Sequence, residues 1–121
     1  MAISSRLAAQ TYCYLATVGR VTGRRHTVEM WFAADPERDR IYMLSGGRDQ
    51  SDWVRNIRHD ARVRVRVGSR TLTGKARWIE DEPDDPLARR LLAAKYQGWA
   101  EGKRLSSWAR NSLPVAVELE A

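Results

Sequence analysis

The sequence contains few of the residues from which many catalytic and metal sites are built. It has one cysteine and two histidines among 121 residues. A single cysteine cannot form an intramolecular disulfide, and two distant histidines with one cysteine argue against a zinc or other metal site. No grouping of serine, histidine and aspartate, or of paired carboxylates, points to hydrolysis. The thiol of Cys13 lies in a strand-like apolar run and is predicted to be a small buried hydrophobic group.

Long hydrophobic runs are also missing. No stretch approaches the roughly 18 apolar residues that a membrane-spanning helix needs, and the first ten residues lack the continuous apolar segment of a signal peptide. With the unpaired cysteine, these absences predict a cytoplasmic protein without a transmembrane segment. There are no low-complexity segments or internal repeats, so residues 1–121 are predicted to form one domain.

Positive charge is in excess, with 21 Lys and Arg residues against 15 Asp and Glu, a net charge of +6. This excess predicts an anionic partner, and nucleic acid, a phosphorylated cofactor or an acidic lipid surface would all satisfy it. Residues 61–67 alternate between arginine and valine, which is the pattern of a half-buried strand. We interpret these arginines as a solvated or salt-bridged strand face, with acidic residues 80–85 as counter-charges nearby in the sequence.

Hydrophobic alternation and turn residues predict about six strands and about three helices. The strands are expected at 12–19, 26–33, 40–45, 61–67, 71–79 and 113–119, and the helices at 3–10, 51–58 and 84–96, the last ending before Gly98. Because most connections are short, pairing should be largely antiparallel. The fold class is therefore α+β, a small barrel with peripheral helices, although periodicity alone leaves an open sheet as an alternative. Gly74, inside an expected strand, suggests a bulge.

The most informative segment is the turn that follows the expected strand 40–45. Ser45, Gly46 and Gly47 lead into a helix that is expected to begin near Ser51. Unpaired N–H groups and the dipole of a helix N-terminus favour a bound anion. Arg48 adds a cation, and the two serines add hydroxyls. The segment predicts a phosphate-binding site, and the alternative is an ordinary strand-to-helix turn.

A second basic feature follows the expected first strand. The turn at residues 19–24 is continued by Arg24, Arg25 and His26. Arginine suits bidentate phosphate binding, and a protonated histidine would donate to phosphate as well. Strand alternation places Arg25 and His26 on opposite faces. The alternative is a solvated hairpin loop.

These motifs occur in a characteristic order: residues 16–24, Trp31-Phe32, residues 45–47 and residues 53–63. In this order they resemble the split β-barrel flavin/deazaflavin-dependent oxidoreductases. The resemblance is strongest to the deazaflavin-dependent nitroreductase branch, with its Gly-Arg-x-Ser/Thr-Gly turn. The sequence is also similar to the wider FMN-binding group related to pyridoxamine 5'-phosphate oxidase. The resemblance implies a homodimeric split barrel with a cofactor groove at the subunit interface.

The resemblance also implies roles for particular residues. The cofactor tail would be held by Arg24, Arg25, His26, Ser45, Gly46, Gly47, Arg48 and Ser51, and the ring would lie against Thr27, Val28, Met30 and Trp31. Trp53 belongs to the same set, with core packing as its alternative. Tyr96 and Trp99, with Trp108, would close the acceptor pocket, and Tyr96 is the candidate proton donor. Packing of the last helix is the alternative for these aromatic residues.

The implied activity is hydride transfer from a reduced deazaflavin, coenzyme F420, to a small-molecule nitro, quinone or activated-alkene acceptor, with FMN as the second choice of cofactor. The sequence departs from the branch at Val21 and His26, where lysine and arginine often stand. This departure motivates one alternative, a non-catalytic barrel that binds flavin, haem or a lipid. The other alternative, a basic nucleic-acid-binding barrel, predicts binding that weakens steeply with salt.

Overall fold

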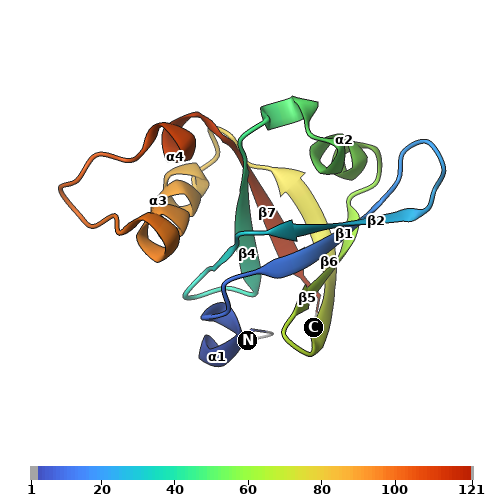
Figure 1. The fold of residues 1–121 in the computed structure, drawn as a ribbon, viewed down its shortest axis with the longest axis horizontal. Helices are drawn as coiled ribbons and strands as arrows, with labels where there is room; N and C mark the ends of the chain where they lie inside the picture. The colour runs from blue at the N-terminus through green and yellow to red at the C-terminus, as the bar shows by residue number, and fades with distance from the viewer. Residues whose placement is uncertain (1–2, 121) are drawn as a thin grey trace.

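The computed structural model describes residues 3–120 as a curled antiparallel sheet with helices around it (Figure 1). The strands are β1 (Cys13–Val18), β2 (Arg25–Met30), β3 (Ala33–Ala34), β4 (Arg40–Ser45), β5 (Arg62–Val67), β6 (Arg70–Trp78) and β7 (Leu113–Leu119). The helices are α1 (Ser5–Ala8), the 3-10 turn η1 (Arg48–Gln50), α2 (Asp52–His59), α3 (Asp85–Gln97) and α4 (Ser107–Asn111). This confirms the predicted α+β class and its antiparallel pairing.

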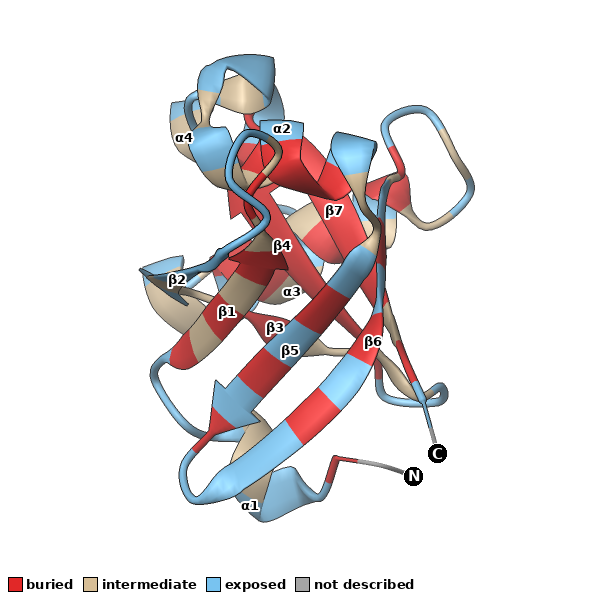
Figure 2. Cartoon of the chain, turned by 90° about the vertical axis from the view of Figure 1, so that its right-hand side faces the viewer, coloured by how far each residue is buried: buried red, intermediate tan, exposed pale blue. Residues whose placement is uncertain are grey.

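The sheet order explains why the sheet closes on itself. The strands follow one another as β2-β1-β5-β6-β7-β4-β3, so β2 and β3 form the two edges. Yet only Trp31 and Phe32 separate these two edge strands in the chain. The sheet must therefore curl until its edges come together. In Figure 2, buried and exposed residues alternate along β5 and β6, as expected of strands that turn one face to the interior. This is the expected split barrel.

Two details of the secondary structure differ from the prediction. The strand expected at 26–33 is interrupted, because the backbone of Phe32 bonds to the Tyr96 hydroxyl instead of a neighbouring strand. The sheet consequently has seven strands, not six. The second difference is α4, which the sequence analysis did not predict; its N-cap Ser106 accepts a hydrogen bond from the Ala109 amide at 3.1 Å.

Strand β7 is buried on both faces. Val115 and Val117 pack into the barrel interior. Ala116 points the other way, into a second core where Leu92 of α3 meets the outer side of β4 and β7. Helix α3 therefore forms a layer outside the barrel, at the side where β4 leads into the Ser45 turn (Figure 1).

Gly74 does not mark a bulge, so that prediction was wrong. The pairing of β6 with β7 runs without interruption from Gly74 to Trp78. A Cβ atom at this position would lie 2.4 Å from the carbonyl oxygen of Glu118. The glycine is explained by the close approach of two strands. At the end of α3, Gly98 has a φ of 67° and stops the helix as predicted.

The arginines of β5 lie on an exposed face, as predicted. Arg62 pairs with Asp60 at 2.6 Å, and the Arg66 guanidinium lies over the Tyr14 ring. The acidic segment forms its ion pairs elsewhere: Glu80 pairs with Arg48, and Glu82 with Arg77. The counter-charges for the β5 arginines therefore do not come from residues 80–85.

Cys13 is fully buried, and burial raises its pKa to about 12, in agreement with its predicted role as a hydrophobic group. Within residues 3–120, no helix has the length and apolarity needed to cross a membrane. The same residues contain no cluster of His, Cys, Asp and Glu side chains that could hold a metal ion.

Candidate functional site

The turn between β1 and β2 is fastened to α2 by Arg20. The Arg20 backbone amide and its Nη1 both donate to Oδ1 of Asn56, at 3.2 and 2.8 Å, and its Nη2 pairs with Asp52 at 3.0 Å. Asn56 is buried, and its Nδ2 donates to the Thr17 hydroxyl at 3.0 Å. These bonds fix the turn against the helix, so the arginine of the Gly-Arg-x-Thr-Gly motif has a structural partner.

Gly19 is needed for the same turn. A Cβ atom here would lie 2.6 Å from His26 Nε2 and 2.8 Å from the carbonyl oxygen of Arg24. The turn can therefore close tightly only with glycine at this position.

The part of the β1–β2 hairpin that follows Arg20 carries exposed positive charge. Arg24, Arg25 and His26 are exposed, and their side chains form no ion pair with the described part of the chain. A pocket of about 210 Å³ lies beside them, lined by Gly19, Arg20, Val21, Thr22, His26, Asp52 and Asn56. The first hairpin thus presents free cations beside a polar hollow.

The turn after β4 is held by its own hydroxyls. Ser45 Oγ donates to the carbonyl oxygen of Arg48 at 2.9 Å and lies 2.9 Å from Ser51 Oγ, which then donates to it. Ser51 stands at the N-cap of α2 but makes no capping bond with its side chain. The side chain of Ser51 thus bonds within the turn and not to the α2 amides. Gly46 and Gly47 are exposed at its apex.

Arg48 is engaged within the protein. Its Nη2 lies 2.6 and 2.5 Å from the two carboxylate oxygens of Glu80, and its Nη1 donates to the carbonyl oxygen of Asn111 at 2.7 Å. Arg89 reinforces the same region, since its Nη1 donates to the carbonyl oxygens of Ala109 and Ser112. Arg48 therefore ties the Ser45 turn to Glu80 and to the end of α4.

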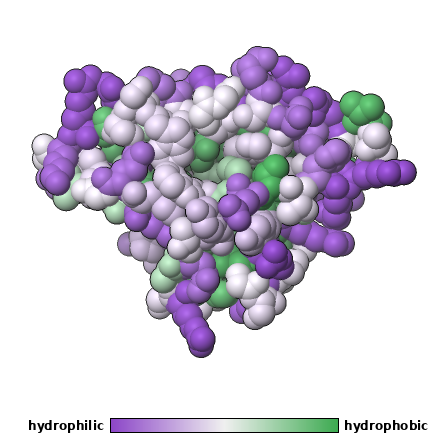
Figure 3. All heavy atoms as spheres, viewed as in Figure 1, coloured by the Kyte–Doolittle hydropathy of each residue, from purple (hydrophilic) through white to green (hydrophobic). Residues whose placement is uncertain are grey.

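An aromatic pocket of about 460 Å³ lies next to this turn. It is lined by Tyr12, Glu29, Met30, Trp31, Leu44, Gln97 and Trp108. Trp31 meets Trp108 edge-on, with ring centroids 5.4 Å apart. A Cβ atom on Gly46 would be 3.5 Å from the Trp108 ring, so the turn reaches the pocket wall. On the face shown in Figure 3, hydrophilic residues predominate, and separate apolar residues lie near the centre and at the upper right edge.

Tyr96 supports the pocket from behind. Its ring stacks on Trp31, with centroids 4.3 Å apart and planes 2° from parallel. Its hydroxyl accepts from the Phe32 amide and donates to the carbonyl oxygen of Thr11 or Phe32. Burial raises the pKa of Tyr96 to about 12. To act as a proton donor, this hydroxyl would have to leave its backbone partners.

The structure brings together only part of the predicted site. Met30 and Trp31 line the aromatic pocket, whereas Thr27 is exposed on β2. Val28 and Trp53 pack against the barrel core. The Trp99 indole donates to the carbonyl oxygen of Lys103 and does not line the pocket.

The sequence alone did not single out Arg20 and Asn56, whose contacts join the β1–β2 turn to α2. The signal was present in the sequence, because Asn56 stands between the apolar residues Val54 and Ile57 on the helix. A polar side chain on a buried helix face normally has a hydrogen-bond partner.

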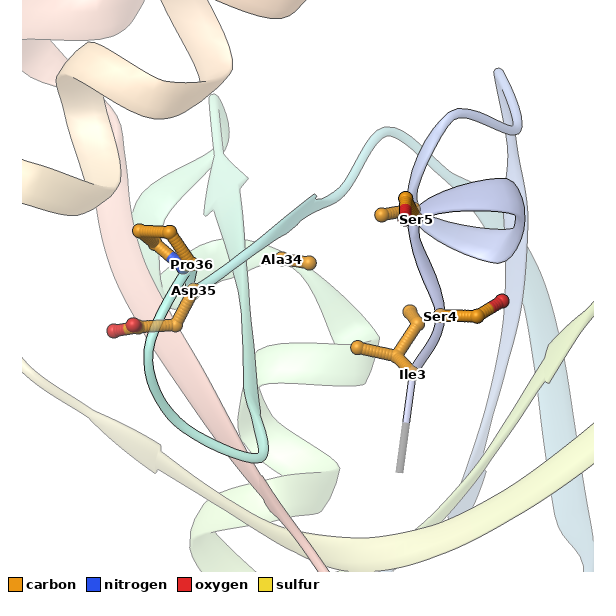
Figure 4. Close-up of a pocket in the computed structure, with 7 residues that line it drawn as sticks. Ile3, Ser4, Ser5, Ala34, Asp35 and Pro36 are labelled. Carbon is orange, nitrogen blue, oxygen red and sulfur yellow. The ribbon is translucent and has the colours of Figure 1, made fainter. Parts of the chain in front are cut away.

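A further pocket, of about 490 Å³, lies between α1 and the β3–β4 loop (Figure 4). Asp35 lines it, but its carboxylate already accepts from the Tyr42 hydroxyl at 2.6 Å and from the Glu37 amide at 2.8 Å. The lining residues are Ile3, Ser4, Ser5, Ala8, Ala34, Asp35 and Pro36. They include neither a cation nor an aromatic ring, so this pocket is poorly suited to an anionic aromatic cofactor.

The aromatic pocket adjoins the glycine turn at Gly46, and in Figure 1 helix α2 lies between this turn and the cationic hairpin. The aromatic pocket is suited to a planar ring, and the glycine turn and the cationic hairpin are suited to a phosphate-bearing tail. These features define the class of split-barrel cofactor-dependent oxidoreductases.

Solved structures show the same fold. A conserved hypothetical protein from Mycobacterium tuberculosis has a TM-score of 0.76 at 20% identity, over 98% of this chain and 82% of that one. A candidate pyridoxamine 5'-phosphate oxidase from Listeria innocua has a TM-score of 0.68 at 18% identity, over 97% and 90% of the two chains. A structure described as an F420 reductase has a TM-score of 0.65 at 23% identity, over 97% and 93%.

The family follows from the sequence itself. Residues 2–120 match the model of the F420H(2)-dependent quinone reductases, and the chain belongs to that family. The comparison with curated proteins gave no match. The protein is thus an oxidoreductase that uses the deazaflavin coenzyme F420 with a quinone-like acceptor, as the resemblance implied.

Proposed function

We propose that the aromatic pocket receives the ring of coenzyme F420 and the quinone, and that the coenzyme tail follows the Ser45 turn toward the first hairpin. The observation that carries this proposal is the position of Gly46, where an added Cβ atom would lie 3.5 Å from the Trp108 ring, so that the turn adjoins the pocket. On the other side of α2, the Arg20–Asn56 bonds bring the hairpin to the same helix.

Each part of this site has a distinct task. Met30, Trp31 and Trp108 offer apolar surface that packs against a flat ring and excludes water. Gly46 leaves room for close approach, and backbone N–H groups near the α2 N-terminus favour an anion. Arg24 and Arg25 add charge-assisted hydrogen bonds, and His26 adds a further donor. When bound, the reduced coenzyme supplies the hydride, and the protein orients it toward the acceptor.

Arg48 has a different task in this proposal. Its guanidinium is held by Glu80 and by the carbonyl oxygen of Asn111, so it positions the Ser45 turn and does not bind phosphate. The anionic tail would then be neutralised by the hairpin, with backbone and hydroxyl groups of the turn as uncharged partners.

We also propose a homodimer in which a second copy covers β2. The support is the exposure of this edge strand, from Arg25 to Thr27, beside the pocket. Light scattering after size exclusion would show twice the mass of 13.8 kDa. A monomer at micromolar concentration would contradict this part. A cytoplasmic location is proposed with it, supported by the single buried cysteine.

The activity is tested by following the oxidation of reduced F420 by a soluble naphthoquinone, with reduced FMN as the comparison. We expect quinone-dependent turnover with F420, and a loss of roughly tenfold or more in kcat/KM for Trp108→Ala. Trp99→Ala is the matched control, because this indole lies outside the pocket. Turnover with FMN alone, or equal losses for both variants, would contradict the proposal.

A further inference from the structure

Between β2 and β3 the backbone N–H and carbonyl groups need hydrogen-bond partners from outside the sheet. Phe32 lies in this break and is fully buried. A buried N–H or carbonyl group without a hydrogen bond destabilises the folded protein. The neighbouring strands do not supply these bonds, because β2 ends at Met30 and β3 begins at Ala33.

The last turn of α3 supplies them. The Phe32 amide donates to the Tyr96 hydroxyl at 3.1 Å. The Phe32 carbonyl oxygen accepts from Lys95 Nζ at 3.0 Å and lies 2.9 Å from the Tyr96 hydroxyl, which donates either to it or to the Thr11 carbonyl oxygen. Lys95 also donates to the carbonyl oxygen of Ala8 at 2.9 Å, and its ammonium group lies 3.7 Å from the Phe32 ring centroid. Two consecutive side chains thus hold one backbone residue.

That backbone residue is the neighbour of Trp31. Since Tyr96 also stacks on the Trp31 indole, the same turn of α3 fixes both the ring and the chain directly after it. We infer that Lys95 and Tyr96 are positioning residues that hold Trp31 in place as a wall of the cofactor pocket. That the pocket binds the cofactor rests on the proposed function. That Lys95 and Tyr96 fix the position of Trp31 rests only on the contacts described above.

The charge on Lys95 is part of the contact. Its ammonium group faces two aromatic rings and two carbonyl oxygens, all of which favour a cation. Burial lowers its pKa to about 8, with the Cys13 thiol as the titratable group on β1 that acts on it. A neutral side chain of similar length at position 95 should therefore bind the Phe32 backbone and ring more weakly.

The first test needs no cofactor. The near-ultraviolet circular dichroism of the Trp31–Tyr96 stack is obtained as the difference between each protein and the same protein with Trp31→Phe. We expect Lys95→Met to lose most of this signal and Lys95→Arg to keep it. Lys103→Met, at an exposed lysine, is the matched control and should keep it too. An unchanged signal in Lys95→Met overturns the inference, whatever the function.

The second test is F420 affinity, measured by titration. We expect Lys95→Met and Tyr96→Phe to raise the Kd roughly tenfold while Lys95→Arg restores it. Urea unfolding checks that the variants are folded. An altered dichroism signal with unchanged affinity would overturn the role toward the cofactor. If the wild-type protein does not bind F420, the proposed function fails, and the dichroism still decides whether Lys95 positions Trp31.

Discussion

The turn between β1 and β2 and the turn between β4 and α2 flank the same helix, and both contain arginine. In the first turn, Arg20 is held by Asn56 and Asp52, which leaves Arg24 and Arg25 free at the surface. In the second, Arg48 is held by Glu80. The first turn therefore offers charge to a ligand, whereas the second offers backbone and hydroxyl groups.

The difference is that Arg48 has a carboxylate within reach, whereas Arg24 and Arg25 form no ion pair within the described residues. A glycine-rich turn with an adjacent arginine suggests a phosphate ligand. Here Glu80, from a distant part of the chain, binds that arginine on two oxygens. The Arg48 Nη1 donates to the carbonyl oxygen of Asn111, so both terminal nitrogens of this guanidinium have partners within the protein.

The largest expected effect comes from removing the anchor of the first turn. Asn56→Ala would leave the buried Thr17 hydroxyl without its side-chain partner and would remove one of the two side-chain partners of the half-buried Arg20 guanidinium, which keeps Asp52. We expect a loss of about 2–3 kcal/mol in the free energy of unfolding, measured with urea. Asn111→Ala, at an exposed asparagine, should change it by less than about 0.5 kcal/mol. Equal effects would mean that the anchor is not needed.

The glycines of the two turns should differ in how well they tolerate a side chain. Gly19→Ala places a Cβ atom 2.8 Å from the backbone oxygen of Arg24, and we expect it to lower the free energy of unfolding by about 1–2 kcal/mol. Gly46→Ala meets only ordinary contacts, at 3.5 Å from Trp108, and should be neutral within about 0.5 kcal/mol. Thermal unfolding of both variants measures the difference. A destabilised Gly46→Ala protein would contradict the view that this turn is open at its apex.

The smallest expected effect concerns the Arg48–Glu80 pair, whose side chains are 42% and 36% exposed. A pair with this exposure should contribute about 0.5–1 kcal/mol. Arg48→Ala and Glu80→Ala should each destabilise the protein, and the double variant should cost less than their sum, because both remove one interaction. Additive effects in urea unfolding would show that the two side chains act independently.

The sequence predicts the parts of this protein that depend on local pattern. The alternation in β5, the Gly98 stop of α3 and the buried Cys13 all follow from neighbouring residues. The break after β2 does not follow from neighbouring residues, because it depends on the Tyr96 hydroxyl, 64 residues further along the chain. The same limit applies to Arg48, whose carboxylate partner lies 32 residues away.

The direct test of the contrast between the two turns is F420 affinity at low ionic strength for two variants. Arg24→Ala/Arg25→Ala should raise the Kd at least about tenfold, because it removes charge-assisted bonds to the tail. Arg48→Ala should stay within about threefold of the wild-type Kd, because its guanidinium serves Glu80. If Arg48→Ala instead abolishes binding while the hairpin variant binds normally, the second turn supplies the charge and the account is wrong.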